Sequence, residues 1–447
     1  MIFPSAQSAL TSFDGSISLD TTVQKPDKYR FFDQKNFGNM ISRGAGLSYV
    51  AASFGLKSKT IDHSSFNRLL SYRDGILEVE AGATLGRVYN YLRGQNRYLP
   101  VQPGHPDITV GGCVAADVHG KNQFRDGTFV SLVERIKLFH PKHGIIELSR
   151  TQNPKLFDLT CGGFGLTGII LSVDLRTRSI PSPFVEITTI PVPAVEDLEK
   201  ILKDIVNKYD LVYSWHDFTK KGRGFGRGFI KAAKFSTAGQ THFFSAEQDH
   251  RHLKRTLFAE RRGNWRWAFF SPWRTVWFNS AYYHFNLIMP ASQKMELYDF
   301  LFPVHNKEAY FKFFGKKGFH ECQFIIPTGK FAEWAERVKC FLSHDSTPVT
   351  LASGKLFAGD PRLLRFTGNG VCMALDFPRS AGSLRFVEFL YNLAMEIGAT
   401  PNIIKDSDLS AKVVAATYPE YERFKTELKL FDSERIFRSE LSERLGL

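Results

Sequence analysis

The sequence predicts an α+β protein of two domains, and three observations carry that prediction. The chain has 447 residues, more than a single hydrophobic core ordinarily holds. Short runs of alternating apolar and polar residues, the pattern of half-buried strands, are mixed with runs of helical spacing. Prolines at positions 181, 183, 191 and 193 separate a glycine-rich first part from an aromatic-rich second part.

The first part, residues 1–180, is predicted to combine short strands with one capped helix. Residues 1–40 are polar and are expected to form an entry arm. Thr84 stands directly before a run whose apolar residues have helical spacing, so we expect it to cap a helix over 85–93. Strands are expected at 60–63, 75–83, 131–139, 144–148 and 170–175.

The second part is predicted to carry longer helices beside apolar strands. Residues 220–234 form a basic, glycine-containing segment, and residues 408–447 are predicted to be helical with many charges. Periodicity predicts helices at 194–209, 331–342 and 384–397 and strands at 322–326 and 371–376.

The chain is strongly basic, with a formal net charge of +13. Nucleic acid, an anionic membrane surface, a phosphorylated substrate or simply a basic surface would each account for this excess. The sequence has no helix-turn-helix, zinc-finger or RNA-recognition pattern, so we expect no nucleic-acid partner.

Targeting signals and cysteine usage favour the cytoplasm. The chain has no run of about eighteen apolar residues, and residues 1–5 lack the charged start and long apolar core of a signal peptide. Its five cysteines include no CxxC pair, so we expect neither a disulfide framework nor a metal site. A reducing compartment fits this usage.

Three glycine-rich stretches predict close contact between the backbone and a large ligand. They lie at 42–48, 111–122 and 162–170, and neither of the first two is a GxGxxG fingerprint or a P-loop. Because glycine has no Cβ, its N–H groups can approach a ligand closely, and positive φ angles cost it little. The first two stretches are therefore expected to hold one flat, phosphorylated cofactor at two points.

These stretches resemble the vanillyl-alcohol-oxidase-like flavoproteins. The matching motifs are Arg-Gly-x-Gly-x-Ser at 43–48, Pro-Gly at 103–104 with Gly-Gly at 111–112, and Gly-x-x-Gly-x-x-Gly-Ile-Ile at 162–170. The resemblance implies an FAD-binding domain of two subdomains (PCMH type). It also implies an inserted substrate domain built on an antiparallel sheet with flanking helices. The implied limits are 1–180 for the FAD domain, 181–404 for the substrate domain and 405–447 for a C-terminal segment that returns to the FAD domain.

Further motifs narrow the resemblance to the decaprenylphosphoryl-ribose 2′-oxidases. Such enzymes oxidise the 2′-hydroxyl of a polyprenyl-phosphoryl ribose to a ketone, which is the first half of epimerisation to the arabinose form. The resemblance therefore implies a lipid-linked substrate, a short-chain reductase as partner and a peripheral place on the inner face of the membrane. The motifs are His119-Gly-Lys-Asn122, Gln323-Phe-Ile-Ile-Pro327, Lys355-Leu-Phe357, Asp376-Phe-Pro378, Lys405-Asp-Ser407 and Tyr418-Pro419.

The resemblance also implies how FAD is held. Covalent members of the superfamily place a histidine where this chain has Leu47, so the implied FAD is not covalently bound. The residues assigned to the cofactor are Arg43, Gly44, Ala45, Gly46, Leu47, Ser48, Tyr49, Pro103, Gly104, Thr109, Gly111, Gly112, Cys113, Ala116, Asp117, His119, Gly120, Asn122, Gly165, Gly168, Ile169, Ile170 and Lys405.

Four residues are predicted to be catalytic. Lys405 matches the family's lysine and is expected to stabilise negative charge on the reduced flavin. Lys405 and His119 are the candidates for orienting the substrate hydroxyl or taking its proton. Gln323 and Lys355 are expected to hold sugar hydroxyls or phosphate. The alternatives are a surface lysine, a structural histidine that bonds its own loop, and a buried glutamine with an internal partner.

The sequence departs from the family in the predicted substrate pocket. The family's Asn-x-Cys-x-Asp-Phe-Pro has Cys372 in place of the asparagine and Ala374 in place of the cysteine. Phe302 stands where the family has a tyrosine before proline. These changes leave the FAD prediction intact and leave the exact sugar and lipid open.

Other functions stay open from the sequence. The alternative enzyme is an aldonolactone or alditol oxidase that acts on a free sugar, although such enzymes usually carry the histidine that Leu47 replaces. A basic binding protein with an inactive flavoprotein fold and a scaffold of a cell-wall complex are the alternatives outside catalysis. The Trp- and Arg-rich segment 245–275 is interpreted as a loop over the active site, a membrane-surface patch or packing within the substrate domain.

Overall fold

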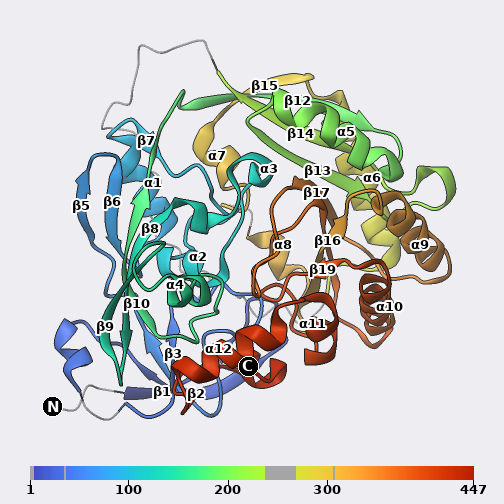
Figure 1. The fold of residues 1–447 in the computed structure, drawn as a ribbon. Coiled ribbons are helices and arrows are strands. Elements are labelled where there is room, and N and C mark those ends of the chain that lie inside the picture. The colour runs from blue at the N-terminus through green and yellow to red at the C-terminus, as the bar shows by residue number, and fades with distance from the viewer. Residues whose placement is uncertain (1–4, 35–36, 237–267, 306–307) are drawn as a thin grey trace.

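Three larger β-sheets flanked by helices form the described part of the chain, and the predicted α+β class is confirmed (Figure 1). The computed structural model describes residues 5–34, 37–236, 268–305 and 308–447. A four-stranded and a five-stranded sheet belong to the first part of the chain, and an eight-stranded sheet belongs to the second. Most of segment 245–275 therefore lies outside the described residues.

The four-stranded sheet contains a hairpin that the polar sequence of residues 1–40 did not indicate. An antiparallel β1–β2 hairpin stands where an entry arm was expected, and β4 pairs in parallel with β2 and β3. The buried Thr21 hydroxyl ties the hairpin down because it lies 3.3 Å from the carbonyl oxygens of Gly55 and Ser58. The strands are β1 (Ser5–Thr11), β2 (Ser18–Gln24), β3 (Met40–Arg43) and β4 (Lys59–Asp62).

The five-stranded sheet is antiparallel and confirms the strands predicted at 75–83, 131–139, 144–148 and 170–175, while the strand predicted at 60–63 is β4 of the four-stranded sheet. Its order is β5-β6-β10-β8-β9. The Thr84 side chain accepts a hydrogen bond from the Arg87 amide at 3.4 Å, so the predicted cap of helix α1 is also confirmed. The strands are β5 (Leu69–Arg73), β6 (Ile76–Glu80), β8 (Val133–His140), β9 (Gly144–Ser149) and β10 (Ile169–Arg176), beside a short pair of β7 (Arg97–Tyr98) and β11 (Arg178–Ser179).

The eight-stranded sheet is antiparallel and has the order β15-β12-β14-β13-β17-β18-β16-β19. The strands predicted at 322–326 and 371–376 are confirmed as its neighbouring strands β16 and β18. The strands are β12 (Phe184–Val192), β13 (Leu211–Asp217), β14 (Arg227–Phe235), β15 (Ser292–Glu296), β16 (Phe319–Pro327), β17 (Leu351–Phe357), β18 (Gly370–Pro378) and β19 (Thr400–Pro401).

The helices predicted at 331–342 and 384–397 are present as α9 and α10, and the helix predicted at 194–209 is present but shorter. The helix expected at 194–209 is α-helical only over 198–205, because 3-10 turns flank it on both sides. The helices are α1 (Leu85–Arg93), α2 (Val110–Ala116), α3 (Gln123–Asp126), α4 (Pro154–Thr160), α5 (Leu198–Ile205), α6 (Pro272–Ile288), α7 (Leu297–Leu301), α8 (Ala309–Lys312), α9 (Phe331–His344), α10 (Ala381–Ile397), α11 (Ala411–Thr417), α12 (Tyr421–Phe431) and α13 (Glu440–Leu445).

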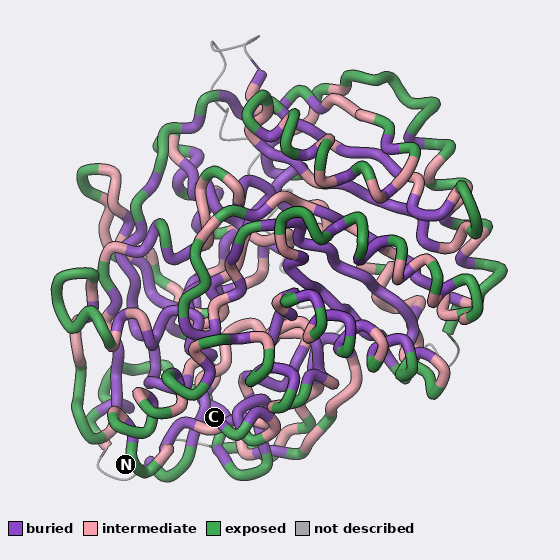
Figure 2. Tube along the Cα trace, turned by 45° about the vertical axis from the view of Figure 1, so that its right-hand side comes forward, coloured by how far each residue is buried: buried purple, intermediate pink, exposed green. Residues whose placement is uncertain are grey.

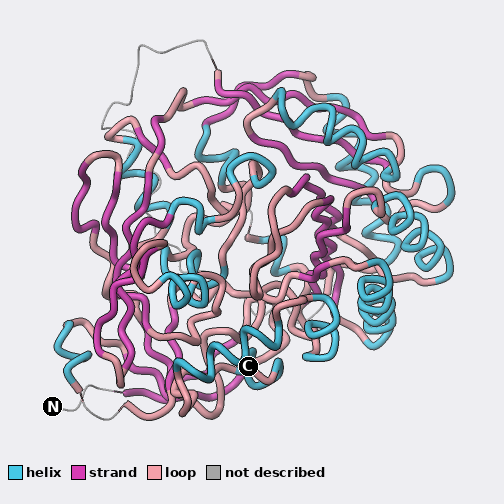
Figure 3. The backbone as a smooth tube through the Cα atoms, in the orientation of Figure 1, coloured by secondary structure: helices cyan, strands magenta, loops and turns pink. Residues whose placement is uncertain are grey.

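The two faces of the eight-stranded sheet have different partners. Helices α5, α9 and α10 cover one face, where Leu198, Trp334 and Phe386 belong to one apolar cluster with the sheet (Figure 3). The strands are largely buried, while the outer turns of these helices are exposed (Figure 2). The other face of the sheet turns toward the first part of the chain and borders the cavity described below.

Residues 405–447 contact both parts of the chain. The Met40 amide donates to the carbonyl of Ile436 at 2.9 Å, and the Arg438 amide donates to the carbonyl of Met40 at 3.0 Å. This segment therefore lies beside β3. Tyr418 donates from its hydroxyl to the carbonyl of Pro401 in β19 at 2.6 Å. The domain limits at 180 and 404 stay predictions.

Candidate active site

A cavity of about 390 Å³ lies where the glycine-rich stretches meet the eight-stranded sheet. Its size is in the range of small-molecule sites. The predicted residues that line it are Gly44, Ala45, Gly46, Leu47, Ser48, Tyr49, Pro103, Gly104, Thr109, Gly111, Gly112, Ala116, Asp117, His119, Gly165, Gly168, Ile170, Gln323, Lys355, Ala374 and Lys405.

The first glycine loop follows β3 and presents bare backbone to the cavity. A Cβ on Gly44 would lie 2.2 Å from Thr109 Oγ1, and a Cβ on Gly46, whose φ is +69°, would lie 2.1 Å from the Arg43 guanidinium. A side chain at Gly44 would clash with Thr109, and one at Gly46 would strain the backbone at this positive φ. The buried Ser48 Oγ has no hydrogen-bond partner among the described residues. The loop is thus built to bring amide groups and one hydroxyl against a bound group, as FAD requires.

Arg43 supports this loop from behind and does not line the cavity. Its Nη1 donates to Ser53 Oγ at 2.9 Å, and its guanidinium lies 5.7 Å from the centre of the Phe54 ring. Burial lowers the pKa of this guanidinium, and the carboxylate of Asp62 opposes that shift. Arg43 therefore shapes the loop rather than touching the cavity.

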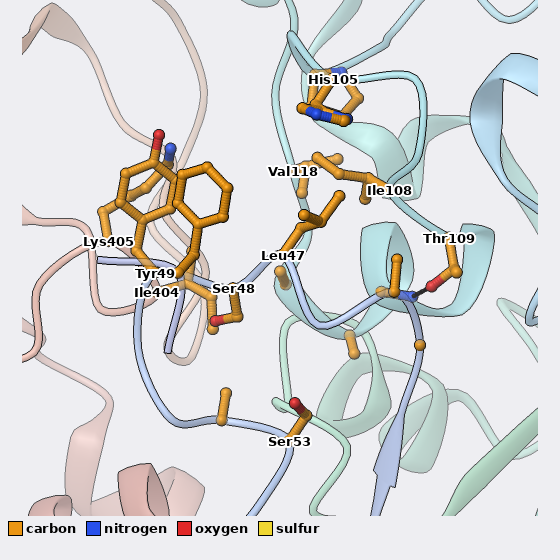
Figure 4. Close-up of a pocket in the computed structure, with 18 of the residues that line it drawn as sticks. Leu47, Ser48, Tyr49, Ser53, His105, Ile108, Thr109, Val118, Ile404 and Lys405 are labelled. Carbon is orange, nitrogen blue, oxygen red and sulfur yellow. Dashed lines mark hydrogen bonds between the residues drawn. The ribbon is translucent and has the colours of Figure 1, made fainter. Parts of the chain in front are cut away.

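The second glycine stretch forms the start of α2, which is packed tightly against β6. The Thr109 side chain caps α2 by accepting from the Gly112 amide at 3.2 Å (Figure 4). The Gly111 amide donates to the carbonyl of Ala81 at 2.8 Å, and a Cβ on Gly111 would lie 2.9 Å from the Ala81 Cβ. This close packing places the first turn of α2, with Gly111 and Gly112, at the cavity wall.

The third glycine stretch, at 162–170, is pinned to α2. The Phe164 amide donates to the carbonyl of Ala115 at 2.8 Å. A Cβ on Gly168, whose φ is +148°, would lie 2.6 Å from the carbonyl oxygen of Phe139. Gly165, Gly168 and Ile170 of β10 therefore close the cavity on this side.

Lys405 lies in the cavity wall between an aromatic ring and a carboxylate. Its Nζ is 3.5 Å from the centre of the Tyr49 ring and 3.1 Å from Glu321 Oε1. Figure 4 shows Lys405 and Tyr49 together, facing Leu47, Ile108 and His105 across the cavity. A positive charge thus sits inside the cavity, as predicted for this lysine.

Glu321 belongs to a polar group that the sequence did not reveal. Glu321 and Asp376 are direct partners in the pairing of β16 with β18. The Tyr310 hydroxyl lies 3.1 Å from Asp376 Oδ2 and 2.7 Å from Thr350 Oγ1. Burial raises the pKa of Asp376 well above its usual range. The neighbouring Glu321 raises it further, while Lys405 opposes the shift. Asp376 therefore holds its proton more tightly than an ordinary aspartate does, beside the Glu321–Lys405 pair.

His119 and Lys355 face each other in a partly desolvated corner. Burial lowers the pKa of His119 well below its usual range, and the positive charge of Lys355 lowers it further. His119 is therefore a neutral imidazole whose ring centre lies 4.8 Å from that of Phe357. Burial likewise lowers the pKa of Lys355. This corner favours an anionic or hydroxyl-bearing ligand, because such a ligand would compensate the buried lysine.

Gln323 has internal partners and still reaches the cavity. Its Oε1 accepts from Asn402 Nδ2 at 2.6 Å, and its Nε2 lies 3.3 Å from Cys372 Sγ. Gln323, Ala374 and Ser353 are partners across β16, β18 and β17, so their side chains share the face that borders the cavity. Asn402 and Ser353 are further lining residues that the sequence did not single out.

Some predicted site residues lie behind the cavity wall. Cys113 and Ile169 point into apolar clusters, and Phe302 packs against Tyr89 and Tyr298. A second group holds loops in place: Asn122 Nδ2 donates to the carbonyl of Pro100 at 3.0 Å, and a Cβ on Gly120 would lie 2.6 Å from Asn122 Oδ1. Cys372 is buried beside Gln323. These residues contact lining residues rather than the cavity itself.

Asp117 lines the cavity but its carboxylate is used inside the protein. It ends α2 with a φ of +42° and accepts from the Thr128 hydroxyl at 2.9 Å and from the Val130 amide at 3.0 Å. Two further histidines, His63 and His105, also line the cavity, and burial lowers the pKa of each to about 4. Both imidazoles are therefore neutral at physiological pH.

The described residues contain no group of three His, Cys, Asp or Glu side chains that could hold a metal ion. Within the same residues, no helix has both the length and the apolarity needed to cross a membrane.

Comparisons with known proteins support an FAD-binding domain in this chain. Residues 30–149 match the family described as FAD binding domain. Over 421 residues the chain is 26% identical to decaprenylphosphoryl-β-D-ribose oxidase of Mycolicibacterium smegmatis, covering 91% of this chain and 89% of that enzyme. Over 147 residues it is 30% identical to an uncharacterised protein of Streptomyces coelicolor, covering 33% of this chain and 40% of that protein.

The matched domain contains the first two glycine stretches, many of whose residues line the cavity. The chain is therefore an FAD-dependent oxidoreductase that acts on CH–OH groups, and it resembles the vanillyl-alcohol-oxidase type. Within that class it resembles decaprenylphosphoryl-β-D-ribose oxidase along nearly its whole length.

Proposed function

We propose that this enzyme oxidises the 2′-hydroxyl of a polyprenyl-phosphoryl ribose to the 2′-keto sugar, the first half of epimerisation to the arabinose form. The observation that carries the proposal is the similarity to decaprenylphosphoryl-β-D-ribose oxidase over 91% of the chain. That similarity extends well beyond the FAD-binding domain at 30–149. It therefore also covers strands of the eight-stranded sheet, which carry the polar wall.

The polar wall has the chemistry that a phosphorylated sugar requires. Lys355 and Lys405 bring two ammonium groups into one cavity, and Lys355 is desolvated. In the proposal, Lys355 binds the phosphate, while Gln323 and Ser353 hydrogen-bond the sugar hydroxyls. Such groups fix the orientation of the ring and set the distance of the reacting carbon from the cofactor.

In the proposal, Lys405 and the residues around it stabilise the developing negative charge and accept the proton that the oxidation releases. Bound FAD supplies the hydride acceptor, as it does in flavoenzymes generally. Lys405 Nζ, which packs against the Tyr49 ring, stabilises negative charge that develops beside it. Glu321 Oε1, which Lys405 holds 3.1 Å away, accepts the proton of the 2′-hydroxyl. His119, neutral and weakly basic, orients that hydroxyl.

We further propose that FAD is bound without a covalent tether. Leu47 lines the cavity, and its side chain has no nucleophilic atom. A separate short-chain reductase would return hydride to the opposite face of the keto sugar. The enzyme would then act as the oxidising half of an epimerase on the inner side of the membrane.

Anaerobic bleaching of the flavin tests the proposal. The purified yellow enzyme is mixed with polyprenyl-phosphoryl ribose, free ribose or a sugar lactone in the absence of oxygen. We expect the lipid-linked ribose to bleach the flavin and free ribose and lactone to leave it oxidised. Bleaching by lactone alone, with peroxide release in air, would instead establish an aldonolactone oxidase.

A further inference from the structure

Helix α6 (Pro272–Ile288) buries polar side chains and exposes apolar ones, the reverse of an ordinary surface helix. Its buried side chains are polar: Thr275, Asn279 and Asn286. Its exposed side is apolar, since Trp273 is 69%, Trp277 70%, Phe285 62% and Ile288 83% exposed. The spacing of these residues puts them on one side of the helix. We call Trp273, Trp277, Phe278, Phe285 and Ile288 the α6 face.

Specific contacts fix this orientation of α6. Asn279 Nδ2 donates to the carbonyl of Val349 at 3.1 Å, and Arg227 Nη2 donates to Ser280 Oγ at 3.0 Å. The Tyr282 ring packs at 4.9 Å from that of Trp215 in β13. Rotation of the helix to hide the α6 face would break these contacts. The exposed apolar surface is therefore a built feature of the fold.

The α6 face lies on the cavity side of the eight-stranded sheet. His216 of β13 is the direct partner of Ala352 of β17 in an antiparallel pair. Trp215, which precedes His216, therefore lies opposite Ser353, which follows Ala352. Because side chains alternate along a strand, Trp215 and Ser353 share one face of the sheet, and His216 and Ala352 share the other. Ser353 lines the cavity and Trp215 supports α6. Figure 1 shows α6 beside β13 and β14.

An apolar cluster connects the start of α6 with the cavity. Phe270, two residues before α6, packs at 4.9 Å from the Phe314 ring and 5.7 Å from the Tyr310 ring. The same cluster includes Tyr49 and Phe311, which line the cavity. A continuous set of aromatic rings thus runs from the cavity wall to the α6 face.

The stretch of sequence that contains α6 has no acidic residue. No Asp or Glu occurs between Glu260 and Glu296, while Arg274 lies on the exposed side of α6 and stacks over Trp273 at 5.2 Å. The whole chain carries a formal charge of +13. Helices that lie in the interface of anionic bilayers typically have exposed tryptophans and aliphatic side chains. They are flanked by cations and lack acidic residues.

We propose that the α6 face docks on an anionic lipid bilayer, with α6 lying in the membrane interface. Docking there places the apolar cluster, and through it the cavity, at the membrane surface. This second statement rests on the proposed function, because it explains how a polyprenyl chain stays in lipid while its sugar enters the cavity. The docking itself does not depend on the substrate.

Vesicle flotation of the FAD-loaded protein tests the docking. The vesicles contain phosphatidylcholine with or without phosphatidylglycerol, and no substrate is present. We expect the protein to float with the anionic vesicles, and the W277S/F285S/I288S variant to bind them at least about tenfold more weakly. The control is L56S/I145S/L430S, which removes three apolar side chains that are 71%, 59% and 80% exposed elsewhere. It is expected to bind like the wild type.

A second measurement does not depend on disruptive variants. Brominated phospholipids in the anionic vesicles should quench the tryptophan fluorescence of the wild type, and the conservative W273F/W277F variant should lose most of that quenching. Circular dichroism and the flavin absorbance confirm that each variant is folded and loaded.

The docking proposal is overturned if the wild type stays unbound, or if the triple variant binds as the wild type does. A wild-type dimer that the triple variant converts to a monomer, without vesicle binding, would show that a second copy covers α6. Bleaching by polyprenyl-phosphoryl ribose in detergent is measured on the same preparations. Vesicle binding without bleaching would refute the proposed function and leave the docking standing.

Discussion

The Nζ atom of Lys405 lies 3.1 Å from Oε1 of Glu321, inside the cavity that the glycine-rich stretches border. The two residues come from distant parts of the chain, with Glu321 in β16 and Lys405 after β19. Their pairing joins a positive charge, which stabilises developing negative charge, to a carboxylate that can accept a proton. The proposed chemistry depends on this pair.

Replacing Lys405 with alanine should stop the oxidation but leave the flavin in place. The glycine cradle is unchanged by the substitution, whereas the positive charge in the cavity is lost. We expect the rate of anaerobic bleaching to fall by at least about a hundredfold, measured by stopped-flow absorbance. The control is Lys412→Ala on the exposed side of α11. Bleaching of K405A at the wild-type rate would remove Lys405 from the mechanism.

Replacing Glu321 with glutamine should separate proton transfer from binding. Glutamine keeps the size of the side chain and can still accept a hydrogen bond from Lys405, but it is a poor base. We expect the bleaching rate at saturating substrate to fall by about a hundredfold, with the substrate concentration for half-saturation changing much less. Glu388→Gln on the exposed side of α10 is the matched control. A fall in affinity alone would assign Glu321 to binding.

The cradle could be predicted from the sequence, but the Glu321–Asp376 pair could not. Glycine motifs at 43–48 and 162–170 are local in the chain, and their function follows from the absence of Cβ atoms. Glu321 and Asp376 meet only through the register of β16 with β18, and no short-range pattern encodes that register. The same limit applies to Asn402, whose amide reaches Gln323 through the fold.

Helix α6 and the residues behind the wall show a second limit. The spacing of apolar residues predicts which face of a helix is apolar, and that face is normally expected to be buried. In α6 the apolar face is exposed and Asn279 is buried. Phe302 and Cys372 were assigned to the substrate pocket by motif, and they lie one layer behind it. A motif gives the position in the chain, while side-chain direction depends on packing.

Because the pKa of Asp376 is raised in the folded state, its contribution to the free energy of unfolding should decrease as the pH rises. Its pKa in the folded state is raised well above the ordinary value of 3.8, so folding favours the protonated carboxyl. This contribution is fully present below the ordinary pKa and is lost as the pH rises through the raised pKa. In thermal unfolding from about pH 4 to pH 8, the wild type should lose stability relative to Asp376→Asn. Asp360→Asn, an exposed control, should follow the wild type. Parallel curves for wild type and D376N would show that Asp376 is ionised in the fold.

Electrophilic inhibitors that act on the family's pocket cysteine should form no adduct with this enzyme. Ala374 lines the cavity at that position, and burial raises the pKa of the nearby Cys372 to about 12, so its reactive thiolate is scarce. Intact-protein mass spectrometry should show an unmodified wild type and a single adduct on Ala374→Cys. An adduct on Cys372 in the wild type would contradict this arrangement.

Replacing Gly44 with alanine should weaken FAD binding. A Cβ at this position would lie 2.2 Å from Thr109 Oγ1, so the first loop and the start of α2 must move apart. We expect FAD to bind at least about tenfold more weakly, which corresponds to ~1.4 kcal/mol, by titration of the apoprotein. Gly94→Ala is the control, because its Cβ would meet no atom closer than 3.4 Å. Equal affinity of G44A and wild type would show that this loop does not hold the cofactor.

The amount and attachment of flavin in the purified protein test the central claim most directly. The protein is denatured in acid, and the flavin in the supernatant is identified by chromatography and quantified against the protein. We expect one FAD per chain, released completely, because the chain has an FAD-binding domain and Leu47 offers no atom for a tether. A colourless protein that takes up no added FAD, or flavin that stays attached to the precipitated chain, would contradict the account.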